Sequence, residues 1–105
     1  MRTVKPLLGA ALLAAALPAF AQTPDPNVAR SLAATCSNCH GTGGVSQGET
    51  ESLAGKPKDE LVGKMQDFKT GKKPATIMHQ LAKGYTDAQI EQIAGWFAAQ
   101  KPAGK

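Results

Sequence analysis

The sequence predicts an all-α protein of about four helices. In four segments between Pro26 and Gln100, apolar residues recur every three or four positions, as on the buried face of a helix. Glycine or proline separates these segments from one another. No segment alternates apolar and polar residues with the period of two that a half-buried strand needs. These observations together predict a small helical domain.

The chain begins with the pattern of a secretory signal peptide. Arg2 and Lys5 precede the apolar run "PLLGAALLAAALPAF", and "AFA" supplies a small-x-small cleavage site after Ala21. The run is shorter than the roughly 20 residues that cross a bilayer, which argues against a membrane anchor. We therefore expect residues 1–21 to be removed and residues 22–105 to form one exported, periplasmic domain without a membrane span.

The charge of the chain is modest but unevenly distributed. The net charge of +4 falls to +2 once Arg2 and Lys5 are removed, which gives little support for nucleic-acid binding. Seven lysines and three acidic residues lie in the segment 56–83. One interpretation of this basic region is a solvated helix face, and the other is a docking surface for an acidic partner.

The first predicted helix leads into the pentad "CSNCH". Asp25 can cap this helix, and Pro26 stands in its first turn, where proline is tolerated. Cys36, Cys39 and His40 follow at positions i, i+3 and i+4, so we expect them to project from one helix face. The glycine-rich segment "GTGGVSQGETES" that follows is expected to be a loop.

Two helices are predicted between this loop and residue 84. "KPKDELVGKMQDFKTG" places Leu61, Met65 and Phe68 on one stripe and ends at Gly71. "KKPATIMHQLAKG" resumes after Pro74 as a short helix whose apolar side is expected to carry four residues: Ile77, Met78, Leu81 and Ala82.

The last predicted helix lies in "YTDAQIEQIAGWFAAQ". Thr86 and Gln89 have the spacing of a capping box at its start. Its buried face is expected to consist of four residues: Ile90, Ile93, Ala94 and Phe97.

A chain of this length buries a limited core, so we expect a cofactor, a metal or a disulfide to support it.

Three chemistries compete for the pentad. A thioredoxin-like dithiol would need a βαβ context, which the sequence lacks. A structural zinc site needs four ligands, and His79 is the single further histidine. Cys-x-x-Cys-His is the signature of covalent haem c attachment, in which two thiols add to the haem vinyl groups and the imidazole binds iron. We expect one haem c on Cys36 and Cys39, with His40 as an axial ligand.

The second axial ligand has three candidates: Met65, Met78 and His79. Met65 lies in an apolar stripe, where methionine usually packs. Met78 and His79 are neighbours, so roughly 100° of helix rotation separates them and one of them faces inward. The apolar side belongs to Met78, whereas His79 shares its side with Lys83 and is expected at the surface. Met78 is therefore the expected ligand, and the other two stay open.

Longer segments resemble a known family. "CSNCHG", "PATIM" and the aromatic-bearing C-terminal helix resemble class I cytochrome c across essentially all of residues 22–105. The segment "TIMHQLAKGYTDAQIEQIAGWFAAQ" is similar to the methionine-ligand region of the cytochrome subunit of flavocytochrome c sulfide dehydrogenases. Members of that family often carry two haem domains, and the single CxxCH makes this chain a one-haem version.

The resemblance implies a fold and a set of site residues. It implies the small class I cytochrome c fold, with about four helices around one haem. The N- and C-terminal helices of that fold cross, and residues 28–35 and 90–97, the latter with Gly95 and Trp96, suit such a contact. It also implies that Cys36 and Cys39 hold the haem. The iron ligands would then be His40 and Met78.

The resemblance also implies a function as an electron carrier and not as an enzyme. The expected partner is an FAD-containing sulfide dehydrogenase subunit that passes electrons to the haem and docks near Lys72, Lys73 and Lys83. Alternatives are a diffusible carrier of another respiratory chain and a haem sensor or ligand-binding module with an open iron site. A haem-free thiol oxidoreductase is a further class.

One departure from the family concerns the loop after the pentad. Many class I cytochromes place a proline there, and residues 41–56 contain none. The group that accepts a hydrogen bond from the second nitrogen of His40 is therefore not identified by the sequence.

Overall fold

The computed structural model describes residues 2–4, 9 and 25–102. Its elements are α1 (Pro26–Ala34), α2 (Ser37–His40), the 3₁₀ helix η1 (Thr42–Gly44), α3 (Lys58–Thr70), α4 (Met78–Lys83) and α5 (Asp87–Ala98). These described residues contain no strand, which confirms the all-α prediction. Most of the predicted leader, including the position after Ala21, lies outside them. No helix that they form has the length and hydropathy of a membrane span.

The described residues form five α-helices, in keeping with the prediction of about four, and the additional one lies in the pentad. The N–H of Cys36 donates to the carbonyl of Ala33, three residues back, at 3.0 Å. The hydroxyl of Thr35 also donates to the Leu32 carbonyl at 2.9 Å. These bonds tighten the chain and end α1 before α2 begins. The pentad therefore spans the α1–α2 junction instead of the end of one long helix.

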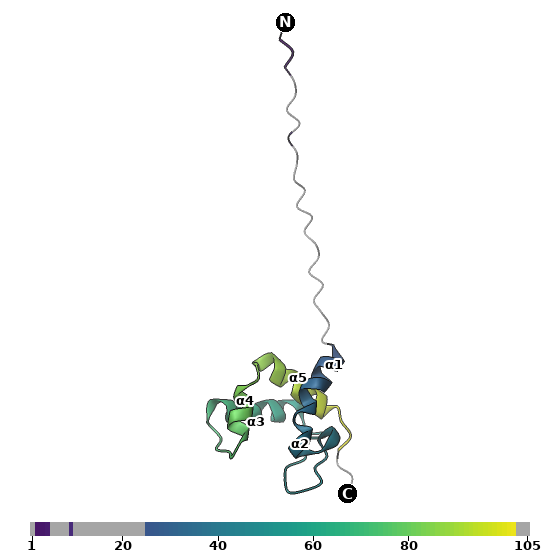
Figure 1. Cartoon of the computed structure of the whole chain (residues 1–105), viewed down its shortest axis with the longest axis vertical. Helices are drawn as coiled ribbons and strands as arrows, with labels where there is room; N and C mark the ends of the chain where they lie inside the picture. Colours follow the sequence, from purple (N-terminus) through teal and green to yellow (C-terminus); the bar gives the residue numbers. More distant parts are fainter. Residues whose placement is uncertain (1, 5–8, 10–24, 103–105) are drawn as a thin grey trace.

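Helices α1 and α5 pack against each other, as the family resemblance implied (Figure 1). Ala33 is fully buried at this contact, whereas Val28 is 46% exposed. The contact therefore uses the C-terminal half of α1. Gly95 does not face α1 in this contact, because a Cβ at Gly95 would lie 3.8 Å from the Lys58 side chain at the start of α3. The expectation that Gly95 helps α1 approach α5 was wrong.

The core joins α1, α3 and α5. Its buried members form one cluster: Ala33, Leu61, Ile93, Ala94 and Phe97. All four residues predicted for the inner face of α5 are buried. The predicted capping box is present, because the Thr86 hydroxyl accepts from the Gln89 N–H and the Gln89 side chain accepts from the Thr86 N–H. Helix α3 ends at Gly71, as predicted, with a left-handed φ of 80°.

A short helix α4 forms as predicted, and most of its predicted apolar residues are not buried. Ile77 is 57% exposed and Leu81 is 46% exposed, and only Ala82 is buried. No side chain caps its N-terminus. The helix packs against α3, but Ile77 and Leu81 border a cavity and so have no protein partner on that side. The sequence correctly identified an apolar side and did not reveal that this side faces a hollow.

Candidate functional site

A cavity of about 440 Å³ lies at the centre of the helical domain. Pockets for small molecules and cofactors typically have roughly 300–1,000 Å³. Most of its wall is apolar and comes from α3, α4 and α5, including Leu61, Phe68, Ile77, Leu81, Ile93 and Phe97. The pentad and the loop after it form the remaining wall. The hollow explains why so few side chains form the core.

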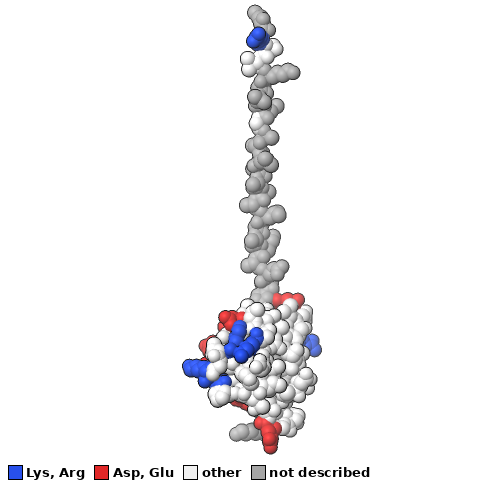
Figure 2. All heavy atoms as spheres, turned by 60° about the vertical axis from the view of Figure 1, so that its left-hand side comes forward, with Lys and Arg blue, Asp and Glu red and all other residues white. Residues whose placement is uncertain are grey.

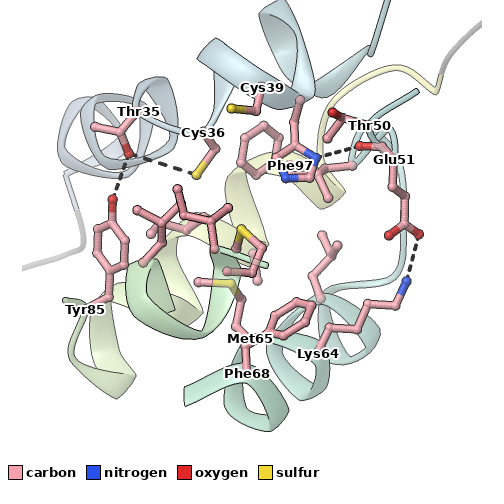
Figure 3. Close-up of a pocket in the computed structure, with 18 residues that line it drawn as sticks. Thr35, Cys36, Cys39, Thr50, Glu51, Lys64, Met65, Phe68, Tyr85 and Phe97 are labelled. Carbon is pink, nitrogen blue, oxygen red and sulfur yellow. Dashed lines mark hydrogen bonds and ion pairs between the residues drawn. The ribbon is translucent and has the colours of Figure 1, made fainter. Parts of the chain in front are cut away.

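The structure brings all four predicted cofactor residues to this cavity. Cys36, Cys39, His40 and Met78 each line it. In Figure 3, Cys36 and Cys39 lie on one side of the cavity, opposite Met65 and Phe68. Both thiols are free. Burial raises the pKa of the Cys36 thiol above its ordinary value, outweighing the opposing effect of the hydrogen bond to Thr35.

The hydrogen bond of His40 answers the question that the sequence left open. Its Nδ1 lies 2.6 Å from the backbone carbonyl oxygen of Glu51. Because a carbonyl can only accept, Nδ1 carries the proton and donates it. This bond assigns the tautomer, so Nε2 is the nitrogen with a free lone pair for a metal ion. The Glu51 carbonyl is thus the hydrogen-bond acceptor for His40 that the sequence did not identify.

The course of the loop explains how Glu51 reaches His40. Gly41 has a φ of 86°, and a Cβ there would lie 1.8 Å from the Val45 carbonyl oxygen. The chain can therefore turn back sharply only with glycine at this position. Farther on, the N–H groups of Leu53 and Ala54 both donate to the Gly44 carbonyl, at 2.8 and 3.1 Å. These bonds hold the two ends of the loop together beside the pentad.

The Glu51 carboxylate is itself held by two lysines. Its Oε1 accepts from the Nζ of Lys56 and, at 2.8 Å, from the Nζ of Lys64. Figure 3 shows the bond to Lys64. The hydrogen bond from Lys56, followed by that from Lys64, lowers the pKa of Glu51 to about 2. Sequence reasoning missed Glu51, because a backbone acceptor has no side-chain signature. The missing proline was the one signal that pointed to this loop.

Two thioethers share the opposite wall. Met78 is the first residue of α4, and Met65 lies on α3, and both line the cavity. His79 does not line it. The expectation that His79 lies at the surface was wrong in one respect: the residue is half-buried, and its buried Nδ1 has no hydrogen-bond partner among the described residues.

A hydrogen bond ties the two walls together next to Cys36. The hydroxyls of Thr35 and Tyr85 lie 2.8 Å apart, and both residues line the cavity. Thr35 belongs to the α1–α2 junction and Tyr85 follows α4. The sequence assigned no role to either residue, because they lie 50 positions apart and their contact has no local sequence pattern.

Most lysines of the basic region are paired with acidic residues. Lys58 pairs with Glu91 at 3.0 Å, and Lys69 with Asp87 at 3.0 Å. Figure 2 shows basic and acidic side chains side by side on the face turned toward the viewer. Lys72 lies 4.0 Å from Asp67. Within the described residues, no ion pair involves Lys73 or Lys83, and both are exposed.

Relatives of the chain are cytochromes and an electron acceptor, although no model of a protein family matches it. It is 39% identical over 66 residues to the cytochrome subunit of sulfide dehydrogenase of Chlorobaculum tepidum, covering 63% of this chain and 60% of that one. It is 33% identical over 75 residues to the thiosulfate dehydrogenase electron acceptor of Thiomonas intermedia, covering 70% and 35%. It is 35% identical over 78 residues to cytochrome c4 of Pseudomonas aeruginosa, covering 73% and 39%. The matches thus span less than two thirds of each of these relatives.

The site fits the group that these relatives imply, a covalently bound haem c. The apolar cavity has both thiols of the CxxCH motif in its wall, and the Nδ1 of His40 is already engaged. The βαβ context of a thioredoxin-like dithiol is missing from the described residues, which form no strand. They also contain no group of three or more His, Cys, Asp or Glu side chains such as a zinc site requires. With its helical fold, this chain resembles the class I c-type cytochromes, and among its relatives is the cytochrome subunit of sulfide dehydrogenase.

Proposed function

We propose that this chain transfers single electrons through one haem c, with His40 and Met78 as its two axial ligands. The observation that carries the proposal is the bond from His40 Nδ1 to the Glu51 carbonyl at 2.6 Å, which leaves Nε2 free beside a cavity that Met78 also lines. When bound, the haem supplies a one-electron Fe(III)/Fe(II) couple. Two protein ligands leave no open position on the iron for a small molecule, which favours a carrier over a sensor.

The residues of this chain would tune that couple. Cys36 and Cys39 would hold the haem through thioether bonds, and the apolar wall would exclude water from its face. A soft thioether from Met78 favours Fe(II) and so raises the reduction potential compared with a second imidazole. The proposed count of one haem rests on the single CxxCH motif in the sequence.

For the electron donor, we propose an FAD-containing sulfide dehydrogenase subunit in the periplasm. The support is the relative from Chlorobaculum tepidum, which is named as the cytochrome subunit of such an enzyme. The leader-like N-terminus supports export. The partner would dock near Lys72, Lys73 and Lys83, which are all exposed. The exposed side chains of Ile77 and Leu81, which border the cavity, would form the apolar part of the same contact.

A diffusible carrier is the second candidate. The relative from Thiomonas intermedia is named as an electron acceptor of thiosulfate dehydrogenase, which favours an acceptor that meets its enzyme transiently. Purification from the native host separates the two candidates. A stable complex that contains flavin supports the subunit, whereas a flavin-free monomer supports the diffusible carrier.

The ligation is tested by the ferric absorption spectrum of the haem-loaded protein. We expect a weak sulfur-to-iron charge-transfer band that Met78→Ala removes, with carbon monoxide binding gained in the ferrous state. Met65→Leu is the matched control, because it replaces the other cavity thioether, and it should keep the band. Loss of the band in Met65→Leu instead would assign the ligand to Met65. Carbon monoxide binding by the unaltered protein would favour the open-site sensor.

The docking surface is tested by the rate of electron transfer from the purified partner. Charge reversal of Lys72, Lys73 and Lys83 together should slow transfer and flatten its dependence on ionic strength. Lys101→Glu, at an exposed position near the C-terminus, is the control for the change in net charge. Equal rates in the triple variant and the unaltered protein would exclude this docking surface.

A further inference from the structure

The backbone of Glu51 has little support of its own. It lies outside the helices, in a stretch in which residues 47–51 are all exposed. Among the hydrogen bonds of the described residues, the bond from His40 is the one that reaches the Glu51 backbone. An exposed loop held by so few bonds samples many conformations. A carbonyl in such a loop orients a histidine ring only if something else fixes its position.

The side chain of the same residue supplies that support. Its carboxylate binds Lys64, one turn and a half into α3, and Lys56, just before that helix. Lys64 also pairs with Glu60 at 3.4 Å, which fixes it along the helix. The side chains of Lys56 and Lys64 are each 28% exposed, so solvent screens these pairs less than it screens fully exposed ones. The loop is thereby tied to the helix that forms the opposite wall of the cavity.

We propose that Glu51, clamped by Lys56 and Lys64, is a positioning residue for His40 and thereby lowers the reduction potential of the haem. The inference rests on the proposed function, because it takes His40 as an iron ligand. A strong hydrogen bond from Nδ1 makes the imidazole a better electron donor, which favours Fe(III). Breaking the clamp frees the loop, weakens that bond and lets the ring rotate. The carbonyl itself remains in every variant, so the effect measured is that of positioning.

A charge-neutral variant separates positioning from simple electrostatics. Glu51→Ala/Lys64→Gln removes one negative and one positive charge, so the net charge does not change. Lys58→Gln/Glu91→Gln is the control: it breaks an ion pair of 3.0 Å whose lysine is more exposed, 48% against 28% for Lys64, and neither residue lines the cavity. All proteins are prepared with haem attached. Two readouts are the midpoint potential and the pattern of hyperfine-shifted haem methyl resonances, which depends on the orientation of the histidine ring.

We expect the clamp variant to be more easily reduced. At the midpoint potential of the unaltered protein, the ratio of reduced to oxidised haem should rise about threefold or more, a shift of roughly 30 mV at 59 mV per tenfold change. Its methyl resonances should also change in order or spread, while the control double variant matches the unaltered protein in both readouts. Lys64→Gln alone should move the resonances part of the way, because Lys56 still holds Glu51.

The failures of the two proposals are distinguishable. Methyl resonances that stay unchanged in the clamp variant, with a potential equal to that of the control variant, would overturn the clamp while leaving the carrier intact. Single variants Glu51→Ala and Lys64→Gln that shift the potential in opposite directions, with unchanged resonances, would reduce the effect to charge and also overturn it. An unaltered protein without a reversible one-electron couple would overturn the proposed function, and the clamp with it.

Discussion

The two walls of the cavity are built differently. The His40 wall, residues 35–55, contains the motif and a loop whose ends are joined by backbone hydrogen bonds to Gly44. Gly44 and Ala54 are buried in it. The Met78 wall, residues 72–85, carries the short helix α4, which has no side-chain cap and buries only Ala82. Contacts within the protein thus hold the His40 wall in place, whereas the apolar side chains of the Met78 wall would be covered only by the cofactor or a partner.

The two walls also differ in how much buried packing supports them. The largest fully buried side chain, Phe97, supports the His40 wall and leaves the Met78 wall without comparable backing. This arrangement would suit the proposed carrier, in which His40 would be held in one orientation while the more exposed Met78 wall would meet partners. Each prediction below strengthens or weakens this contrast.

The largest effect is expected from removing the support of the His40 wall. Phe97 is 1% exposed, and its carbonyl accepts from the N–H of Gly55 at 2.9 Å. Phe97→Ala should lower the free energy of unfolding by about 3–5 kcal/mol, because it leaves a cavity that the structure fills only in part. Val28→Ala, at a position 46% exposed, should cost less than about 1 kcal/mol. Urea unfolding of the haem-loaded protein measures both, and equal losses would contradict the contrast.

A pair of glycines compares the His40 wall with the turn that leads into the Met78 wall. Gly44 and Gly71 both have left-handed φ values, 81° and 80°. A Cβ at Gly44 would lie 2.7 Å from the Phe97 ring and 2.9 Å from the Ala54 nitrogen, whereas Gly71 has nothing within 4 Å. Gly71→Ala should therefore cost about 1–2 kcal/mol from backbone strain alone. Gly44→Ala should cost about 1–3 kcal/mol more from overpacking.

The outcome that would weaken the contrast is an equal loss of stability in both glycine variants. The measurement is the midpoint and slope of chemical unfolding for each variant under one set of conditions. An unchanged slope would show that both variants lose stability without a change in the surface exposed on unfolding.

The bond between the walls should have an intermediate effect. Tyr85→Phe deletes the hydroxyl that lies 2.8 Å from the Thr35 hydroxyl and should cost about 1 kcal/mol. Thr35→Val should cost more, because it also removes the bond to the Leu32 carbonyl, and the double variant should lose less than the sum, because both changes remove the bond between Thr35 and Tyr85. Strict additivity in a double-mutant cycle would mean that this bond does not connect the walls energetically.

The smallest effect is expected just after the Met78 wall, at the start of α5. Asp87 accepts from Gln66 and from Lys69, and these hydrogen bonds lower the pKa of its carboxyl below 3.8. A lowered folded-state pKa means that the stabilisation is present above pH 3.8 and is lost as the pH falls through the folded value. Asp87→Asn should therefore remove part of the acid dependence of the unfolding midpoint. A variant with the same acid dependence as the unaltered protein would contradict this assignment.

Much of this architecture could be predicted because it depends on local spacing. The four buried residues of α5, its capping box and the end of α3 at Gly71 all follow from helical periodicity and from the conformational freedom of glycine. The convergence of Cys36, Cys39, His40 and Met78 on one cavity also followed from their spacing and from the apolar side of Met78. Errors arose where the environment of a residue depends on distant partners, as at His79 and Gly95.

The amino-acid sequence by itself indicated which residues we propose to hold the haem, because covalent attachment needs two thiols and an imidazole at one fixed spacing. Only the tertiary structure decided which carbonyl orients His40, and it did so through a loop that returns to the pentad at Glu51. The physical reason is that every residue carries a carbonyl, so the acceptor is chosen by the path of the backbone. The same holds for Thr35 and Tyr85, which meet only because the helices between them pack.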